Sequence, residues 1–207
     1  IDRAIEADNN GENPYSYVQS NIVGFLNLLE ACRHHGLPHL VYASSSSIYG
    51  MDAHVPFSET DRTDQPVSLY AATKKSEEAM AYAYSKLYAI QTIGLRFFTV
   101  YGPWGRPDMA PIKFMKAISS GQEIPVFNHG EMLRDFTYID DITEGVRRIL
   151  HAEVDEKVPY RIYNIGNSQP VKLLDFIHSI EVVTGHQACM KMLGMQPGDV
   201  TRTYADT

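Results

Sequence analysis

The chain of 207 residues is 44% hydrophobic and 21% charged, which is enough for one globular domain with a core, or for one domain with a smaller lobe. Its 18 basic and 25 acidic residues leave a net charge of −7 without any basic block, so we expect no nucleic-acid partner. Its apolar runs are far shorter than the roughly 20 residues of a membrane helix, so we expect no membrane span.

The first half of the chain alternates helices and strands. The predicted elements are helices over 17–35 and 69–88 and strands over 37–43 and 91–98, with a loop over 50–66. Gly36 and Pro38 end the first helix. The run 37–43 is almost continuously apolar, which predicts a strand buried on both faces of a parallel sheet. This order predicts an α/β fold with a doubly wound parallel sheet, whose functional loops lie at the carboxyl ends of the strands.

The second half begins with an irregular passage rich in glycine and proline. The predicted elements that follow are helices over 112–119, 140–151 and 171–184 and strands over 124–127, 136–139 and 161–165. The sequence has no internal repeat or separate linker, so we expect this half to pack on the first as a lobe. We assign residues 1–107 to a first domain and 108–207 to a smaller α+β lobe, with some interleaving.

Tyr70 and Lys74 lie four residues apart near the start of the second long helix, and this spacing places them on one helical face. A nearby ammonium favours the phenolate form of tyrosine, which can then act as a base. The same spacing also occurs by chance on many surface helices. Four serines, 44–47, follow the first strand at the ligand-facing edge of the sheet, although a serine-rich turn can also satisfy its own backbone. The two features together predict a site for a reacting alcohol or carbonyl.

Several phrases of the sequence resemble one protein family. They are ASSSSIYG, YAATK, LRFFTVYGPWGRPDMA, RDFTYIDD, YNIGN and MQPGDV. With these phrases the chain resembles the extended short-chain dehydrogenase/reductase family, and in particular its NAD-dependent nucleotide-sugar epimerases. GPWGRPDMA and MQPGDV are the more specific phrases and are similar to those of UDP-glucuronate 4-epimerases. The resemblance covers almost the whole chain after about residue 12, and it implies a Rossmann-like first domain that binds NAD and a second lobe that binds the sugar nucleotide.

The resemblance also implies a reaction. It is the reversible oxidation of C4 in a UDP-hexuronic acid or a related UDP-sugar through a transient 4-keto sugar, with NAD as cofactor. Tyr70 would take the proton from the sugar 4-hydroxyl, and Ser45 would be the catalytic serine. Lys74 would favour the phenolate and bind the nicotinamide ribose. Asn21 and Ser44 are further candidates for the cofactor site, to which Tyr70 and Lys74 also belong.

The resemblance gives a second set of residues for the UDP-sugar. The candidates are Ser46, Ser47, Thr99, Arg106, Val126, Phe127, Arg134, Gln196, Asp199 and Arg202. Arg134 suits a diphosphate, because a guanidinium matches phosphate oxygens, but an ion pair with Asp135 or Asp140 is an equal alternative. Thr99 is a candidate contact to the sugar carboxylate and could equally be a packing residue. The eight histidines form no metal-ligand pattern, so we expect no metal.

Other activities are weighed on the same residues. Nucleotide-sugar 4,6-dehydratases resemble this scaffold but carry an Asp-Glu pair where this chain has Ser46 and Ser47, so dehydration is disfavoured. UDP-glucuronate decarboxylases also oxidise C4, and this alternative stays open. Cys32 and Cys189 match no disulfide framework, which indicates a cytoplasmic setting. The resemblance further implies a homodimer, formed through the two long helices of the first half.

One expected part of such an enzyme is missing from the sequence. A dinucleotide site needs a glycine-rich turn between a strand and a helix, and neither GxGxxG nor GxxGxxG occurs in the 207 residues. Since the chain begins at Ile1, we expect it to be part of a longer protein, with on the order of 70 to 100 further residues before it. The other hypothesis is a truncated, inactive homologue that binds a sugar nucleotide.

Overall fold

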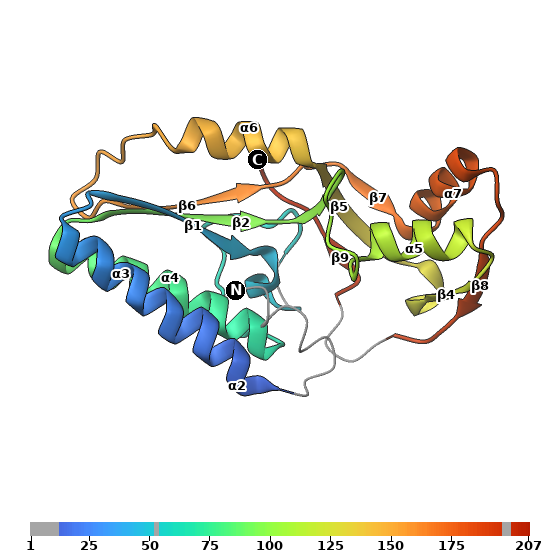
Figure 1. Cartoon of the computed structure of the whole chain (residues 1–207), viewed down its shortest axis with the longest axis horizontal. Coiled ribbons are helices and arrows are strands. Elements are labelled where there is room, and N and C mark those ends of the chain that lie inside the picture. Colours follow the sequence, from blue (N-terminus) through green and yellow to red (C-terminus); the bar gives the residue numbers. More distant parts are fainter. Residues whose placement is uncertain (1–12, 52–53, 196–199) are drawn as a thin grey trace. The chain divides into compact units, whose positions relative to one another are not determined.

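The computed structural model describes residues 13–51, 54–195 and 200–207 (Figure 1). The chain forms two compact units. Unit 1 comprises Ile1–Ala53, Glu59–Phe97 and Val146–Asn164, and unit 2 comprises His54–Ser58, Phe98–Gly145 and Ile165–Thr207. Each unit is therefore built from segments that are distant in the sequence.

Unit 1 holds a three-stranded sheet in the order β1-β2-β6. Its elements are α2 (Pro14–Tyr17), the π-helical segment η1 (Val18–Val23), α3 (Gly24–His35), β1 (His39–Ser45), the 3-10 helix η2 (Ser46–Tyr49), α4 (Leu69–Tyr88), β2 (Gln91–Phe97) and β6 (Tyr160–Ile165). The strands β1 and β2 run parallel. The helices α3 and α4 lie side by side along one face of the sheet (Figure 1). The predicted order of helices and strands is confirmed for this half of the chain.

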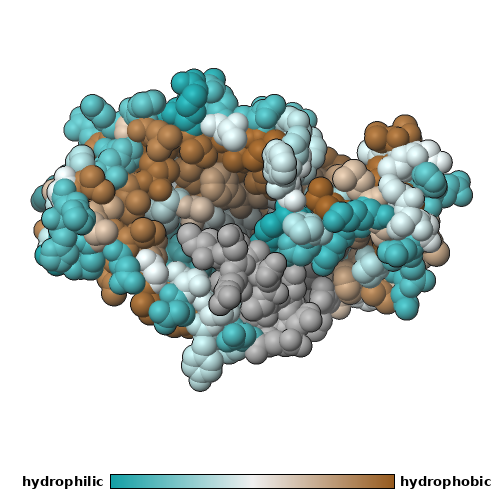
Figure 2. Space-filling model, in the orientation of Figure 1, coloured by the Kyte–Doolittle hydropathy of each residue, from teal (hydrophilic) through white to brown (hydrophobic). Residues whose placement is uncertain are grey.

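The strand β1 is less buried than its sequence predicts. Its side chains alternate, since Tyr42 and Ser44 are buried while Ala43 between them is exposed. The prediction of a strand buried on both faces is therefore wrong for the described residues, because alternation is the pattern of a strand with one covered face. The covered face packs on α3 and α4 in a core that contains Phe25, Leu29, Tyr42 and Ala81. Figure 2 shows further hydrophobic surface, in brown, over the strands of this sheet.

The helix α4 begins and ends where its sequence dictates. The hydroxyl of Ser68 accepts a hydrogen bond from the backbone N–H of Ala71 at 3.1 Å and caps the first turn, and Ala89 in the left-handed region ends the helix. Its buried face is unusually polar. The buried polar residues are Thr73, Glu77, Glu78 and Ser85. A helix that buries two glutamates needs partners for them, and these partners surround the site described below.

The described residues of unit 2 form a four-stranded sheet, a two-stranded ladder and several helices. Its elements are β3 (Thr99–Tyr101), α5 (Ala110–Ser119), β4 (Glu123–Val126), the 3-10 helix η3 (Phe127–Gly130), β5 (Leu133–Tyr138), β7 (Pro170–Lys172), α7 (Leu173–Thr184), β8 (Cys189–Met192) and β9 (Arg202–Thr203). The helix α6 (Ile139–Ile149) runs from unit 2 into unit 1. The strand β5 pairs with β3 and β9 in parallel and with β7 in antiparallel orientation. The ladder joins β4 to β8.

The core of unit 2 is a cluster of apolar side chains between α5, β4 and α7. It contains Phe114, Ile118, Ile124, Val126, Met132, Leu173 and Ile177. Sequence analysis missed β3, β7, β8 and β9, which have only three, three, four and two residues and are too short for an alternating pattern to stand out. The helix predicted over 171–184 begins only at Leu173, because the residues before it form β7.

Candidate active site

Tyr70 and Lys74 lie at the start of α4 and approach each other as their spacing predicts. The Nζ atom of Lys74 lies 6.0 Å from the centroid of the Tyr70 ring. The same Nζ donates a hydrogen bond to the carbonyl oxygen of Ala43 at 3.2 Å, and the Lys74 side chain is only 15% exposed. The helix α4 thus brings the tyrosine and the lysine to the carboxyl end of β1, which contains Ser44 and Ser45 and is followed by Ser46 and Ser47.

The four serines differ in their burial and in the hydrogen bonds that they form. Ser44 is buried, and its hydroxyl donates to Oε1 of Glu78 at 2.7 Å. Ser45 is half-buried and caps η2, since its Oγ accepts hydrogen bonds from the backbone N–H of Ser47 at 3.3 Å and from the Ser47 hydroxyl at 2.8 Å. Ser46 and Ser47 are also half-buried. The turn-forming bonds are therefore present, and they leave the hydroxyl proton of Ser45 available to a further acceptor.

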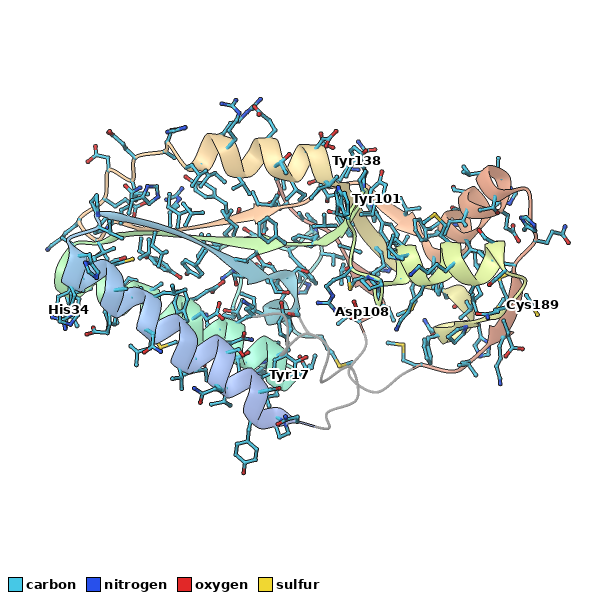
Figure 3. The ribbon with its side chains drawn as sticks, viewed as in Figure 1. Tyr17, His34, Tyr101, Asp108, Tyr138 and Cys189 are labelled. Carbon is cyan, nitrogen blue, oxygen red and sulfur yellow. The ribbon has the colours of Figure 1, made fainter. Side chains whose placement is uncertain are left out.

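Asn21 lies on the π-helical segment η1 and contacts the same end of α4. Its Nδ2 donates to Oγ1 of Thr73 at 3.0 Å, and that hydroxyl donates to the backbone carbonyl of Tyr70 at 2.8 Å. One turn before Asn21 lies Tyr17, labelled in Figure 3, whose ring centroid is 5.8 Å from that of Tyr70. Sequence analysis did not consider Tyr17 as a neighbour of Tyr70, because the two residues are far apart in the sequence.

A buried ion pair joins β2 to α4 behind the serine turn. The guanidinium of Arg96 meets the carboxylate of Glu78 through two contacts, Nε to Oε1 at 3.0 Å and Nη2 to Oε2 at 2.9 Å, and the side chains are 4% and 2% exposed. Arg96 Nη1 also donates to the hydroxyl of Tyr49 at 2.9 Å, which donates to Asn164 Oδ1 at 2.7 Å. Burial opposes the charge of Arg96, but Glu78 raises the pKa of Arg96 overall. The ionised pair fixes the two elements that flank the serines.

Glu77 is the second buried glutamate of α4, and it faces Lys74. Its Oε1 and Oε2 atoms lie 3.2 and 3.1 Å from Nζ, and its side chain is 5% exposed. Burial raises the pKa of Glu77 to about 7, although the charge and hydrogen bonds of Lys74 act in the opposite direction. Sequence analysis missed Glu77, because a glutamate in a helix rich in lysine and glutamate is typical of a solvated face.

Arg134 and Thr99 lie on neighbouring strands of unit 2. Thr99 is half-buried on β3, which runs beside β5. Arg134 is half-buried on β5, and its Nη1 donates to the backbone carbonyl of Leu133 at 3.1 Å. The carboxylate of Asp135 is fully buried. It accepts hydrogen bonds from the backbone N–H groups of Asn167, Ser168 and Ala205 at 2.9, 3.0 and 3.1 Å. Asp135 thus ties β5 to two other segments of unit 2.

Two further candidate arginines of unit 2 are exposed. Arg106 forms an ion pair with Asp108, labelled in Figure 3, with Nε 2.8 Å from Oδ1. Arg202 lies on β9 and, together with Lys172 of β7, lines a cavity of about 520 Å³. This cavity places two cations together on one face of unit 2.

Val126 and Phe127 lie where β4 ends. The side chain of Val126 is fully buried in the core of unit 2, so only its main chain is left to contact a ligand. Phe127 is half-buried against the same core. Gln196 and Asp199 lie outside the described residues.

Nowhere in residues 13–51, 54–195 and 200–207 do three His, Cys, Asp or Glu side chains gather as a metal ion would require. None of the helices in this part of the chain combines the length and hydropathy needed to cross a bilayer. Cys32 is buried, Cys189 is exposed, and both are free thiols.

A parallel sheet with a tyrosine and a lysine near the carboxyl end of one strand is the arrangement expected of extended short-chain dehydrogenases/reductases. Residues 4–166 match the model of the NAD dependent epimerase/dehydratase family, and the chain belongs to this family. The resemblance inferred from the sequence phrases is thereby confirmed.

Individual relatives agree with this assignment. Over 94% of its length the chain is 52% identical to protein CapI of Staphylococcus aureus and 47% identical to a probable UDP-glucuronate 4-epimerase of Rhizobium meliloti. Its structure resembles that of UDP-glucuronic acid 4-epimerase from Bacillus cereus in complex with UDP-glucuronic acid and NAD, with a TM-score of 0.87 and 36% identity over 95% of this chain. The chain spans 63%, 61% and 61% of the lengths of these three proteins. The α/β, Rossmann-like fold class is confirmed.

Proposed function

We propose that the protein catalyses the NAD-dependent epimerisation of a UDP-hexuronic acid at C4 through a transient 4-keto sugar. The observation that carries this proposal is the position of Lys74, whose ammonium bonds to the carbonyl of Ala43 near the end of β1 and lies 6.0 Å from the centroid of the Tyr70 ring. An ammonium in that place supports a phenolate base beside the serine turn. The named relatives support a UDP-glucuronate-like substrate.

Tyr70 and Ser45 would both contact the oxygen of the sugar 4-hydroxyl. Tyr70, as phenolate, accepts the proton of the 4-hydroxyl and later returns it, so that the proton balance closes over the cycle. Ser45 would donate a hydrogen bond from its hydroxyl to the same oxygen, because its Oγ already accepts from the Ser47 hydroxyl. NAD, when bound, would supply reversible hydride transfer at C4, so that epimerisation involves no net oxidation.

The residues present fit the nicotinamide end of NAD. An ammonium has three donors, and those of Lys74 contact the carbonyl of Ala43 and both carboxylate oxygens of Glu77, so a ribose hydroxyl would take the place of one of the Glu77 contacts. Ser44 would contact the cofactor only through its main chain, because its hydroxyl is committed to Glu78. Asn21 would act by fixing the first turn of α4 through Thr73.

Unit 2 would bind the nucleotide and the sugar carboxylate. We assign the diphosphate to Arg134, with Arg202 and Arg106 as further cations, because guanidinium groups match phosphate oxygens. Thr99 would contact the sugar carboxylate. Main-chain atoms of Val126 and the ring of Phe127 would meet the uracil, and Ser46 and Ser47 of unit 1, with Gln196 and Asp199, complete the proposed set.

The proposed enzyme acts in the cytoplasm as a homodimer formed by α3 and α4. Exposed apolar side chains on these helices support such an interface, and they are Leu26, Leu28 and Leu87. Sedimentation of the purified protein at several concentrations measures the oligomeric state.

The activity is tested with UDP-glucuronate and NAD, with the products separated by chromatography. We expect UDP-galacturonate, and we expect Tyr70→Phe to lower the rate by about 10² to 10⁴-fold, because the ring is kept while the base is lost. Tyr82→Phe is the matched control, since Tyr82 is an exposed tyrosine of the same helix. Formation of UDP-xylose would indicate decarboxylation instead, and full activity in Tyr70→Phe would refute the role of Tyr70.

A further inference from the structure

The ammonium of Lys74 lies near two acidic groups rather than one. The centroid of the Tyr70 ring is 6.0 Å from Nζ. Both carboxylate oxygens of Glu77 lie within 3.2 Å of Nζ, and the carbonyl of Ala43 accepts a third contact. One largely covered cation therefore contacts a carboxylate and lies near the phenol that the proposed function uses as its base.

The surroundings of Glu77 leave Lys74 as its counter-ion. From α4 itself the charged groups that act on Glu77 are Lys74 and the neighbouring Glu78. On β1, the charge of Glu77 contributes to the raised pKa of the Tyr42 hydroxyl. Glu78 is already engaged by the guanidinium of Arg96 through two contacts, so that cation serves the other glutamate.

We propose that Glu77 is a positioning residue that holds the ammonium of Lys74 at the end of β1 and limits the positive field that Lys74 exerts on Tyr70. The inference rests on the proposed function, since it assigns Glu77 to a site in which Tyr70 is the base. Two charges about 3 Å apart in a buried place interact much more strongly than they would in water. An ionised Glu77 therefore compensates much of the charge of Lys74, while its two oxygens fix where that charge lies.

The substitution Glu77→Gln separates these two effects. Glutamine keeps an oxygen that accepts from Nζ and has almost the same volume, but it carries no charge. The full positive field of Lys74 then acts on Tyr70. We expect the pH midpoint of tyrosinate formation at Tyr70 to fall by about one unit relative to the unaltered protein. The measurement is ultraviolet difference absorbance, in which each protein is compared with its own Tyr70→Phe counterpart so that the other tyrosines cancel.

The matched control is Glu156→Gln, because Glu156 also forms an ion pair, with Arg161 at 2.6 Å, but on the exposed surface. It should leave the midpoint unchanged. An unchanged or higher midpoint in folded Glu77→Gln would overturn the proposal. If that variant does not fold, Glu77→Asp decides, since it withdraws the carboxylate by one methylene and should lower the midpoint by a smaller amount. The titration needs neither substrate nor NAD, so its outcome is separate from any failure to convert UDP-glucuronate.

Discussion

The two units differ in how exposed their cationic side chains are. In unit 1 the guanidinium of Arg96 is buried and the side chain of Lys74 is only 15% exposed, and they are bonded to the buried carboxylates of Glu78 and Glu77. In unit 2 the proposed ligand cations Arg106 and Arg202 are exposed and Arg134 is half-buried. Unit 1 therefore holds its cations in place through ion pairs with its own carboxylates, and the buried charge of Glu78 depends on Arg96. The exposed cations of unit 2 carry little of the fold and are suited to an anionic ligand, so substitutions in the two units should separate stability from binding.

Arg96→Met gives the largest expected loss of stability. It leaves the carboxylate of Glu78 buried without its counter-ion, which costs about 3 to 5 kcal/mol in the free energy of unfolding. Urea denaturation followed by circular dichroism measures the change. The control is Arg106→Ala in unit 2, where an exposed ion pair with Asp108 should cost less than about 1 kcal/mol. Equal losses in the two variants would contradict the contrast between the units.

Glu77→Gln should change how stability depends on pH. The pKa of Glu77 is raised from 4.5 to about 7, so the folded protein binds a proton that the unfolded chain releases. The stability from this proton is fully present below pH 4.5 and is lost as the pH rises through about 7. The variant has no such carboxylate, so its free energy of unfolding does not fall in this way. The free energy of unfolding of the variant minus that of the unaltered protein should therefore rise between pH 5 and 8, by on the order of 2 kcal/mol.

Unfolding in urea at pH 5 and at pH 8 measures this difference for both proteins. A difference that is the same at the two pH values, or one that falls as the pH rises, would contradict the raised pKa. Glu156→Gln again serves as the control, because Glu156 is exposed and its removal should leave the pH dependence of stability as it was.

The same contrast explains which parts of the site were predictable from the sequence. The Tyr70 and Lys74 pair follows from spacing within one helix, and the serines follow from their place after a strand. The contacts of Arg96 with Glu78 and of Tyr49 with Asn164 join residues that are 18 and 115 positions apart. No local pattern encodes such contacts. A glutamate of an amphipathic helix also predicts a solvated face, whereas α4 buries Glu77 and Glu78 against the sheet.

The elements of the fold also differ in whether a local sequence pattern predicts them. The helix α4 has enough turns for its periodicity to predict both of its ends. Gly36 ends α3 as predicted, and it does so in the left-handed conformation. The short strands around β5 depend instead on backbone bonds that Asp135 organises from distant segments. Val126 illustrates the limit of a resemblance, because a position that is similar to the family's uracil contact here places its side chain in the core.

Arg202→Ala gives the smallest of the expected effects and tests unit 2 from the side of binding. We expect affinity for UDP-glucuronate to fall by about tenfold, which corresponds to roughly 1.4 kcal/mol, since a charge-assisted contact to the diphosphate is lost. The stability of the fold should stay within about 0.5 kcal/mol, because the side chain is exposed. Isothermal titration calorimetry measures the affinity. Lys191→Ala is the control, since Lys191 is an exposed cation of the same unit that pairs with Glu123. Loss of affinity in both variants would indicate a general effect of net charge, whereas a loss confined to Arg202→Ala would assign the diphosphate to the cavity beside β9.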